Sequence, residues 1–192
     1  MNTRRVLLGV TGASGMPYSF RLAQILGSTP GLELHLVVSK AAKQVLELEA
    51  DEPLEALTSC ATAVYSDSDL AAPPASGSWL HQGMVVCPCS MHSLAAISQG
   101  FAGSLLHRAA DVTLKEGRPL VLVPRETPLN RVHLRNLLTA SEAGAVILPA
   151  MPAFYHRPRS LTDIVDHLVS RILDHLGVCH NLSKRWNGLA ED

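Results

Sequence analysis

Short, uniformly apolar runs alternate along the chain with longer segments whose apolar residues recur every three or four positions. The apolar runs predict strands at 4–10, 32–39, 83–89, 118–124 and 145–149. The periodic segments predict helices at 16–28, 40–50, 90–100, 104–117, 130–144 and 160–177. Strands without polar alternation are buried on both faces, which is typical of a parallel sheet covered by helices. We therefore expect an α/β fold, a single-domain doubly wound parallel sheet in a Rossmann/flavodoxin-like three-layer sandwich over residues 1–192.

Two segments do not fit this alternation. Residues 67–83 are rich in Pro, Gly and Ser, so we expect a long loop there that borders a site. The segment 178–192 follows the last predicted helix and is expected to be a tail, either an oligomer contact or a frayed end.

Composition narrows the function classes. Charged residues make up 17% of the chain and hydrophobic residues 47%, whereas about 25% charged is usual for a soluble domain. We expect the extra apolar surface to be buried between subunits. The net charge of −1 and the aromatic content of 4% argue against a nucleic-acid or membrane-surface role. No apolar run approaches the ~18 residues of a membrane span, and we expect a cytoplasmic protein.

The four cysteines do not predict a metal site or a disulfide framework. Cys87 and Cys89 are separated by a single proline, which is neither the redox nor the zinc-ribbon spacing. We expect two small buried thiols at a strand end. The nine histidines form no HExxH motif or Cys/His array, so no metal is predicted.

Two strand–helix junctions carry small polar residues. The first, Gly12-Ala13-Ser14-Gly15, matches neither the dinucleotide nor the Walker spelling, yet it would present backbone N–H groups at a helix N-terminus. From its residues alone, an ordinary tight turn and an anion-binding loop are equally good interpretations. The second junction, Cys89 to Ser93, repeats the arrangement with Ser90 as a helix cap. Two such junctions at strand ends favour a ligand site, because parallel sheets bind ligands there.

Several charged or aromatic residues have both a functional and a structural interpretation. Arg125 directly follows an apolar strand, where its planar guanidinium suits a phosphate. Arg108 and Lys115 are two helical turns apart, with Asp111 between them, which also fits a surface ion-pair ladder. The remaining candidates are Arg171 beside an apolar stripe, Tyr155 in a proline-bounded loop and Glu49 at a helix end, where the dipole disfavours a carboxylate.

The sequence resembles the UbiX-type flavin prenyltransferases, within a wider group of FMN-binding decarboxylase-like flavoproteins. The resemblance runs nearly end to end and is carried by GVTGASG, GMVVCPCS, RAADVTLKEGRPLVLVPRETP, GAVILPAMPAFYHRP and VDHLVSRILDHLG. It implies an enzyme that joins the dimethylallyl group of dimethylallyl phosphate to N5 and C6 of reduced FMN, without a metal. It further implies delivery of the prenylated FMN to a UbiD-type decarboxylase, and a homo-oligomer, usually a dodecamer.

The resemblance also implies roles for particular residues. Flavin would be bound by Gly12, Ala13, Ser14, Ser39, Ser90, Met91, His92, Ser93 and Arg125, with Ser14 close to N5. The prenyl donor would be bound by Arg108, Lys115, Glu126, Tyr155, Arg171 and Trp186, with Arg108 contributed by a neighbouring subunit or close to the phosphate. The implied catalytic residues are Ser14, Glu49, Lys115 and Glu126. Members of the family vary at Met91 and His92, so flavin contacts there are open.

Two other functions compete with prenyl transfer. An FMN-dependent decarboxylase of a cysteine-containing substrate would require a PxMNxxM segment, and the corresponding region here reads PAMPAFYH. A non-enzymatic FMN carrier would need only the flavin residues. The second set of basic residues distinguishes an enzyme that binds a second phosphate from such a carrier.

Overall fold

The computed structural model describes residues 4–183 and is built on a six-stranded, all-parallel sheet. The strands lie in the order β3-β2-β1-β4-β5-β6, so the strand order reverses between β1 and β4. Their bounds are Arg4–Val10 (β1), Leu32–Val38 (β2), Ala63–Ser66 (β3), Gly83–Cys89 (β4), Leu120–Pro124 (β5) and Val146–Ile147 (β6). The expected doubly wound parallel sheet is confirmed.

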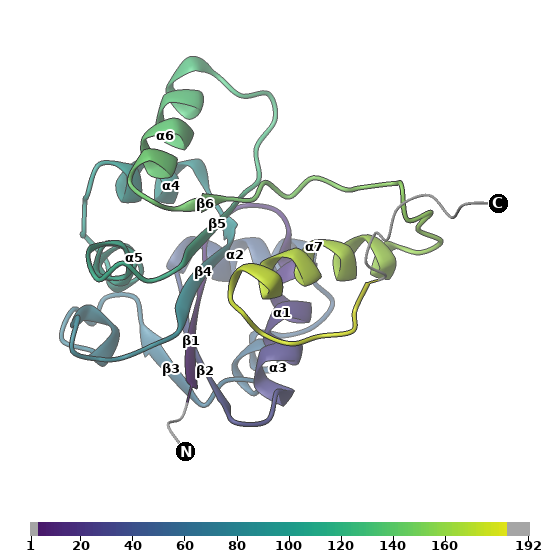
Figure 1. Ribbon diagram of the computed structural model, residues 1–192, viewed down its shortest axis with the longest axis horizontal. Coiled ribbons are helices and arrows are strands. Elements are labelled where there is room, and N and C mark those ends of the chain that lie inside the picture. The colour runs from purple at the N-terminus through teal and green to yellow at the C-terminus, as the bar shows by residue number, and fades with distance from the viewer. Residues whose placement is uncertain (1–3, 184–192) are drawn as a thin grey trace.

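Helices cover both faces of this sheet. Their bounds are Met16–Ser28 (α1), Lys40–Glu49 (α2), Leu54–Thr58 (α3), Met91–Ser98 (α4), Leu105–Lys115 (α5), Arg131–Glu142 (α6) and Leu161–His175 (α7), with a 3-10 turn at Pro73–Ala75 (η1). Side chains of α1, α2, α3 and α7 enter one buried apolar cluster, and those of α4, α5 and α6 enter another. Figure 1 shows α4, α5 and α6 on the opposite side of the sheet from α1, α3 and α7.

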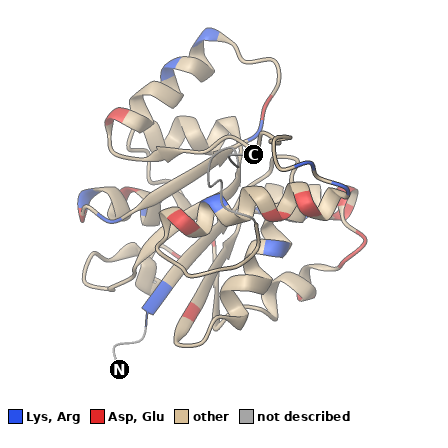
Figure 2. Ribbon diagram, turned by 45° about the vertical axis from the view of Figure 1, so that its right-hand side comes forward, with Lys and Arg blue, Asp and Glu red and all other residues tan. Residues whose placement is uncertain are grey.

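Alternation along β1 explains why two cores form. Val6 and Leu8 are buried in the first cluster and Leu7 in the second, because successive side chains of a strand point to opposite faces. Charged residues are confined to the periphery. Figure 2 shows them on helices and loops, whereas the strands carry them only at their amino ends.

The structure differs from the sequence-based expectation at three elements. Strand β3 and the short helix α3 were not predicted, and β6 spans two residues rather than five. β3 lies at the edge of the sheet, and its residues alternate between half-buried and exposed, so it lacks the continuous apolar run of the central strands. The expected loop at 67–83 contains η1 but is otherwise irregular.

Cys87 and Cys89 are buried free thiols at the end of β4, as expected. Burial raises the pKa of Cys89 to about 12 and raises that of Cys87 further, so both are inert neutral groups. Among residues 4–183, no helix is long and apolar enough to cross a membrane, and no three His, Cys, Asp or Glu side chains are grouped as a metal would require.

Candidate active site

The loops that follow β1 and β4 meet at the point where the strand order reverses. The hydroxyl of Thr11 donates to the carbonyl of Pro88 at 2.8 Å and accepts from the backbone N–H of Ser90 at 2.7 Å. Thr11 is fully buried, so these bonds fix the two loops against each other. Open parallel sheets bind ligands in the crevice at such a reversal point.

A cavity of about 490 Å³ lies at this edge of the sheet. Five of the residues predicted to bind flavin line it: Gly12, Ser39, Ser90, His92 and Ser93. Its remaining walls come from the start of α2, the loop after β3 and the start of α5, through Lys40, Ala41, Asp67, Gly103, Ser104, Leu106 and His107. The structure therefore gathers predicted residues from three separate strand ends at one cavity.

Close packing of Gly12 sets one wall of this cavity. A Cβ atom added to Gly12 would lie 2.5 Å from the Cβ of Ala41, in the first turn of α2. That distance is far inside van der Waals contact, so only glycine lets the loop after β1 approach α2 this closely.

Serines cap the two helices that begin at this cavity after β2 and β4. The Ser39 hydroxyl accepts from the backbone N–H of Ala42 at 3.1 Å, at the start of α2. The Ser90 hydroxyl accepts from the N–H of Ser93 at 3.2 Å, at the start of α4. A serine cap is neutral and uses one of the N–H groups of the first turn, so the positive end of each helix dipole keeps its attraction for an anion.

The N-terminus of α1 is filled differently. The carboxylate of Glu49 accepts from the backbone N–H groups of Gly15 at 2.9 Å and Met16 at 3.3 Å. Burial raises the pKa of Glu49, but hydrogen bonds from Ser14, Gly15 and Met16, with the nearby charge of Arg125, outweigh it and hold the pKa below its ordinary value. Glu49 ends α2, where its own helix dipole disfavours it, and α1 supplies the compensating positive end.

The N-terminus of α5 also holds a carboxylate. Asp67 accepts from the backbone N–H of Leu106 at 3.0 Å, and its carbonyl accepts from Leu105 at 2.8 Å. The hydroxyl of Ser104 also caps α5, where it accepts from the backbone N–H of His107 at 3.4 Å. Acidic side chains of the chain itself thus occupy N–H groups at α1 and α5, whereas α2 and α4 carry a neutral serine alone. An added anion is repelled at α1 and α5 and attracted at α2 and α4.

Two histidines lie at the serine-capped N-terminus of α4, His92 on α4 itself and His107 on α5. The Nε2 atom of His107 lies 3.1 Å from the hydroxyl of Ser93, and the ring centroids of His92 and His107 are 6.0 Å apart. Burial lowers the pKa of His107, and the charge of His92 lowers it further against the opposing effect of Asp67. His107 was missed in the sequence. Its position three residues after the helix-capping residue Ser104 would have pointed to it, because such a side chain shares the cap's end of the helix.

A second cavity, of about 320 Å³, holds three more of the predicted residues. Met91, Arg125 and Glu126 line it, together with the proline-rich segment after β6. Arg125 directly follows β5 and its charge stabilises the Glu49 carboxylate, so Arg125, Glu49 and Ser14 belong to one electrostatic group. Ala13 is buried in the loop between β1 and α1.

The residues predicted to bind the prenyl donor lie far apart within the single chain. Arg108 donates to Asp111 and to the carbonyl of Ala75, and Lys115 pairs with Glu116, all on or beside α5. Arg171 pairs with Asp174 at 2.8 Å on α7, on the opposite face of the sheet.

Tyr155 lies in the loop before α7, with its exposed ring edge-on to the rings of His156 and His167 at 5.6 and 5.4 Å. It therefore lies near the α7 end of the predicted donor set and not near the α5 end. Trp186, also predicted to bind the donor, lies outside the described residues.

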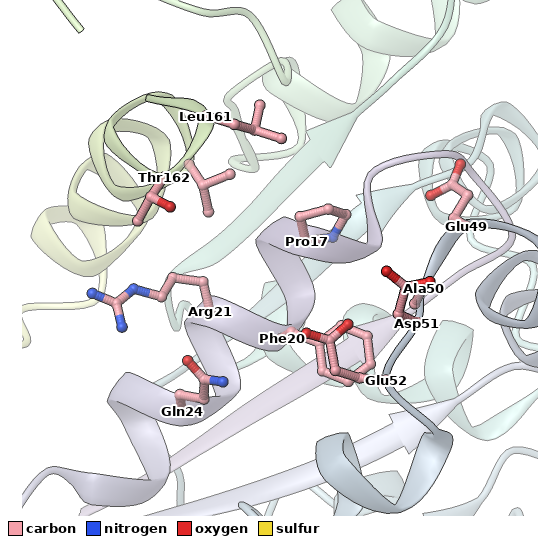
Figure 3. A pocket seen from close by; sticks show the side chains of 11 residues that line it. Pro17, Phe20, Arg21, Gln24, Glu49, Ala50, Asp51, Glu52, Leu161 and Thr162 are labelled. Atoms are coloured by element: carbon pink, nitrogen blue, oxygen red, sulfur yellow. The ribbon is translucent and has the colours of Figure 1, made fainter. Parts of the chain in front are cut away.

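A third cavity, of about 460 Å³, lies between α1, α7 and residues 49–52. Figure 3 shows Arg21 projecting from α1, Leu161 and Thr162 from α7, and Glu49 beside the start of α1. Arg21 is paired with Asp166, and the lining adds three carboxylates, from Glu49, Asp51 and Glu52. This lining does not suit an anionic cofactor.

Comparison with known proteins agrees with this geometry. The family model described as Flavoprotein matches residues 1–173. A probable UbiX-like flavin prenyltransferase from Bacillus subtilis is 50% identical over 185 residues, covering 96% of this chain and 90% of the relative. The chain belongs to the flavoprotein family and, within it, to the UbiX-like flavin prenyltransferases.

Solved structures of UbiX-like proteins share the fold closely. The crystal structure of AnUbiX (PadA1) in complex with FMN and dimethylallyl pyrophosphate has a TM-score of 0.95 at 44% identity, covering 98% of this chain and all of that one. A dodecameric FMN-dependent UbiX-like decarboxylase from Escherichia coli O157:H7 has a TM-score of 0.93 at 47% identity, covering 96% of this chain and all of that one.

The donors at the larger cavity fit the flavin nucleotide that a UbiX-like prenyltransferase requires. A volume of about 490 Å³ lies within the range of cofactor pockets. Serine hydroxyls, Lys40 and two histidines supply donors for a phosphate, and Gly12 in the loop after β1 lines the same cavity without a side chain.

Proposed function

We propose that this chain transfers the dimethylallyl group of dimethylallyl phosphate to N5 and C6 of reduced FMN. The observation that carries the proposal is the cavity at the reversal point, where five predicted flavin residues line one space beside the serine-capped N-termini of α2 and α4. Membership of the UbiX-like prenyltransferases and the full-length likeness to AnUbiX support it.

The flavin phosphate is assigned to the N-termini of α2 and α4. Ser39 and Ser90 are neutral caps, and Lys40 adds a positive charge at the same cavity. The loop at Gly12 to Ser14 then borders the flavin ring, with Ser14 held beside Glu49. When bound, reduced FMN supplies the electron-rich acceptor atoms. The protein's part is to fix the two reactants face to face, which removes a large entropic share of the barrier.

Charged residues are proposed to act on the prenyl donor, dimethylallyl phosphate. Breaking the allylic C–O bond builds negative charge on the departing phosphate, which Arg108, Lys115 and Arg171 are proposed to stabilise. Glu126 is proposed to give a proton to that phosphate, and Glu49, next to Ser14, to move a proton during ring closure.

This donor site requires more than one subunit. Arg108 and Lys115 lie on the α5 face of the sheet, and Arg171 lies on the α7 face, so one chain does not bring them together. We propose that a homo-oligomer, as in the dodecameric relative, joins the two sets. The exposed apolar residues Val132, Leu134 and Leu138 on α6 and Phe154 in the loop before α7 supply surface for such contacts.

Two further expectations extend this proposal. Delivery of the product to a UbiD-type decarboxylase follows from the resemblance alone. A cytoplasmic location stays a prediction from the sequence, which has no apolar run of membrane-spanning length. The competing FMN carrier would bind flavin in the same cavity and leave the donor residues without a role. The cysteine-substrate decarboxylase is disfavoured by the segment PAMPAFYH and by the high identity to prenyltransferases.

Anaerobic incubation with reduced FMN and dimethylallyl phosphate tests the proposal. Mass spectrometry should find a flavin heavier by one prenyl unit, and the product should not form with Arg171→Met, which keeps the side-chain length but removes the charge. Bound FMN without an adduct would support the carrier. An adduct formed only from dimethylallyl diphosphate would revise the donor.

A further inference from the structure

His92 and His107 form a pair on the wall of the flavin cavity, and no step of the proposed prenyl transfer needs them to change protonation. His92 lies in the first turn of α4 and His107 in the first turn of α5. Their ring planes are inclined by 53° with centroids 6.0 Å apart, and both residues line the cavity. The two rings thus lie together at the serine-capped N-terminus of α4, one carried by α4 itself and the other by α5.

The remaining charged groups at this cavity come from two other elements. Lys40 contributes a positive charge from α2, and Asp67 contributes a carboxylate from the loop after β3. Asp67 is engaged by the backbone of α5 at 3.0 Å. Without an anion, burial and the neighbouring His92 keep the pKa of His107 below its ordinary value in spite of Asp67, so His107 is neutral near pH 7.

Ser93 connects the pair to the helix cap. Its hydroxyl lies 3.1 Å from Nε2 of His107 and 3.3 Å from the hydroxyl of Ser90. In an imidazolium both ring nitrogens donate, so protonated His107 must donate to the Ser93 oxygen. The hydroxyl hydrogen of Ser93 is then available to an anion at the N-terminus of α4.

We propose that His92 and His107 are a proton-linked clamp for the flavin phosphate, so that the phosphate binds with uptake of a proton and flavin affinity falls as the pH rises. The inference rests on the proposed flavin site and adds its pH control. The proton comes from solvent and is held by the imidazole pair beside the phosphate dianion. No bond other than hydrogen bonds forms or breaks.

The sign of the effect follows from linkage. A phosphate dianion beside His107 favours its protonated form and raises its pKa, and each unit of that rise corresponds to about tenfold in affinity between the protonated and neutral forms. A phosphate monoester has its own second pKa near ~6, so the dianion is lost in more acid solution. Affinity should therefore be highest near pH ~6 and fall by about tenfold towards pH ~8.

The test is the dissociation constant of oxidised FMN with the full chain, measured by titration calorimetry from pH ~6 to ~8.5. Parallel titrations in buffers of different ionisation enthalpy give the protons taken up on binding, which needs no variant. Riboflavin, which lacks the phosphate, separates the phosphate clamp from protonation near the ring. The variants are His92→Gln and His107→Gln. The control is His175→Gln, an exposed histidine in the last turn of α7.

Wild type and His175→Gln should lose about tenfold in FMN affinity over this range with proton uptake, and His107→Gln should change by less than about twofold. Riboflavin affinity should be flat. A flat FMN profile in wild type, a slope retained in both histidine variants, or the same slope with riboflavin would overturn the clamp. Absence of FMN binding at every pH would instead refute the proposed function itself.

Discussion

The N-termini of α1 and α4 follow two neighbouring strands and open onto the same edge of the sheet, yet they are filled in opposite ways. Glu49 places its carboxylate on the N–H groups of Gly15 and Met16 at α1, whereas a neutral serine, Ser90, caps α4. Both ends carry the same helix dipole. Whether such an end binds an external anion depends on whether the chain has already supplied one.

The contrast between α1 and α4 bears on two interpretations of the loop at Gly12 to Gly15, which the sequence left open. The loop at Gly12 to Gly15 is as good an anion loop as a tight turn when its residues alone are considered. Glu49 lies 34 residues from Gly15, and only the fold brings it there. We therefore propose that the flavin phosphate lies at the N-termini of α2 and α4 and the flavin ring at the loop before α1.

The largest expected effect comes from removing the charge at α1. Glu49→Gln should lower the rate of prenyl transfer by about 10² or more, because a proton-transfer group is lost. Its FMN affinity should stay within about threefold of wild type, since the phosphate binds elsewhere. Single-turnover rates and FMN titrations measure the two quantities separately. Glu47→Gln, exposed on the same helix, is the control. A collapse of FMN affinity with a normal rate per bound flavin would contradict the assignment.

Substitution of Gly12 tests the close approach between the loop after β1 and helix α2. In Gly12→Ala the new methyl group meets the Cβ of Ala41 at 2.5 Å, so the loop must move away from α2. We expect a loss of about 1–3 kcal/mol in the free energy of unfolding, as for other overpacked sites, together with weaker FMN binding. Urea denaturation measures the first. Gly103→Ala is the control for stability, because its methyl group would meet nothing within 4 Å. Equal stability losses in the two variants would refute the steric argument.

Substitution of Ser90 tests the role of the serine-capped N-terminus of α4. Ser90→Ala should weaken FMN binding by about tenfold, the equivalent of one hydrogen bond to a charged group, and leave riboflavin binding nearly unchanged. Loss of the cap alone costs about 1 kcal/mol of stability. Ser160→Ala removes the cap of α7, which is remote from the cavity, and should show the stability loss alone. Equal weakening of riboflavin and FMN would place the phosphate elsewhere.

The smallest expected effect is on how the free energy of unfolding changes as the pH falls. The folded-state pKa of Glu49 lies below its unfolded value of 4.5, so its contribution is fully present above pH 4.5 and is lost as the pH falls through the lower folded value. Because Glu49 is exposed, this contribution is under about 1 kcal/mol. Urea midpoints of wild type and Glu49→Gln should differ most at neutral pH and converge in acid. A difference between the two midpoints that widens in acid would show that the folded state does not lower the pKa of Glu49.

The sequence predicted most of the fold because its central strands are apolar throughout. The predicted bounds of β1, α1 and β4 match the observed ones, whereas β3 was missed because an edge strand alternates and resembles a loop. The residues predicted to bind flavin follow strand ends directly, and five of them line one cavity. His107 was missed because its helix, α5, follows another helix and not a strand end. The contact of Glu49 with the N-terminus of α1 depends on the tertiary fold, which no local pattern reveals.

A crystal structure of the chain with FMN bound tests the central claim most directly. We expect the phosphate at hydrogen-bond distance from the backbone N–H groups that begin α2 and α4, with the Glu49 carboxylate still bound to Gly15 and Met16. A phosphate seated on the N–H groups of Gly15 and Met16, with Glu49 displaced, would contradict it.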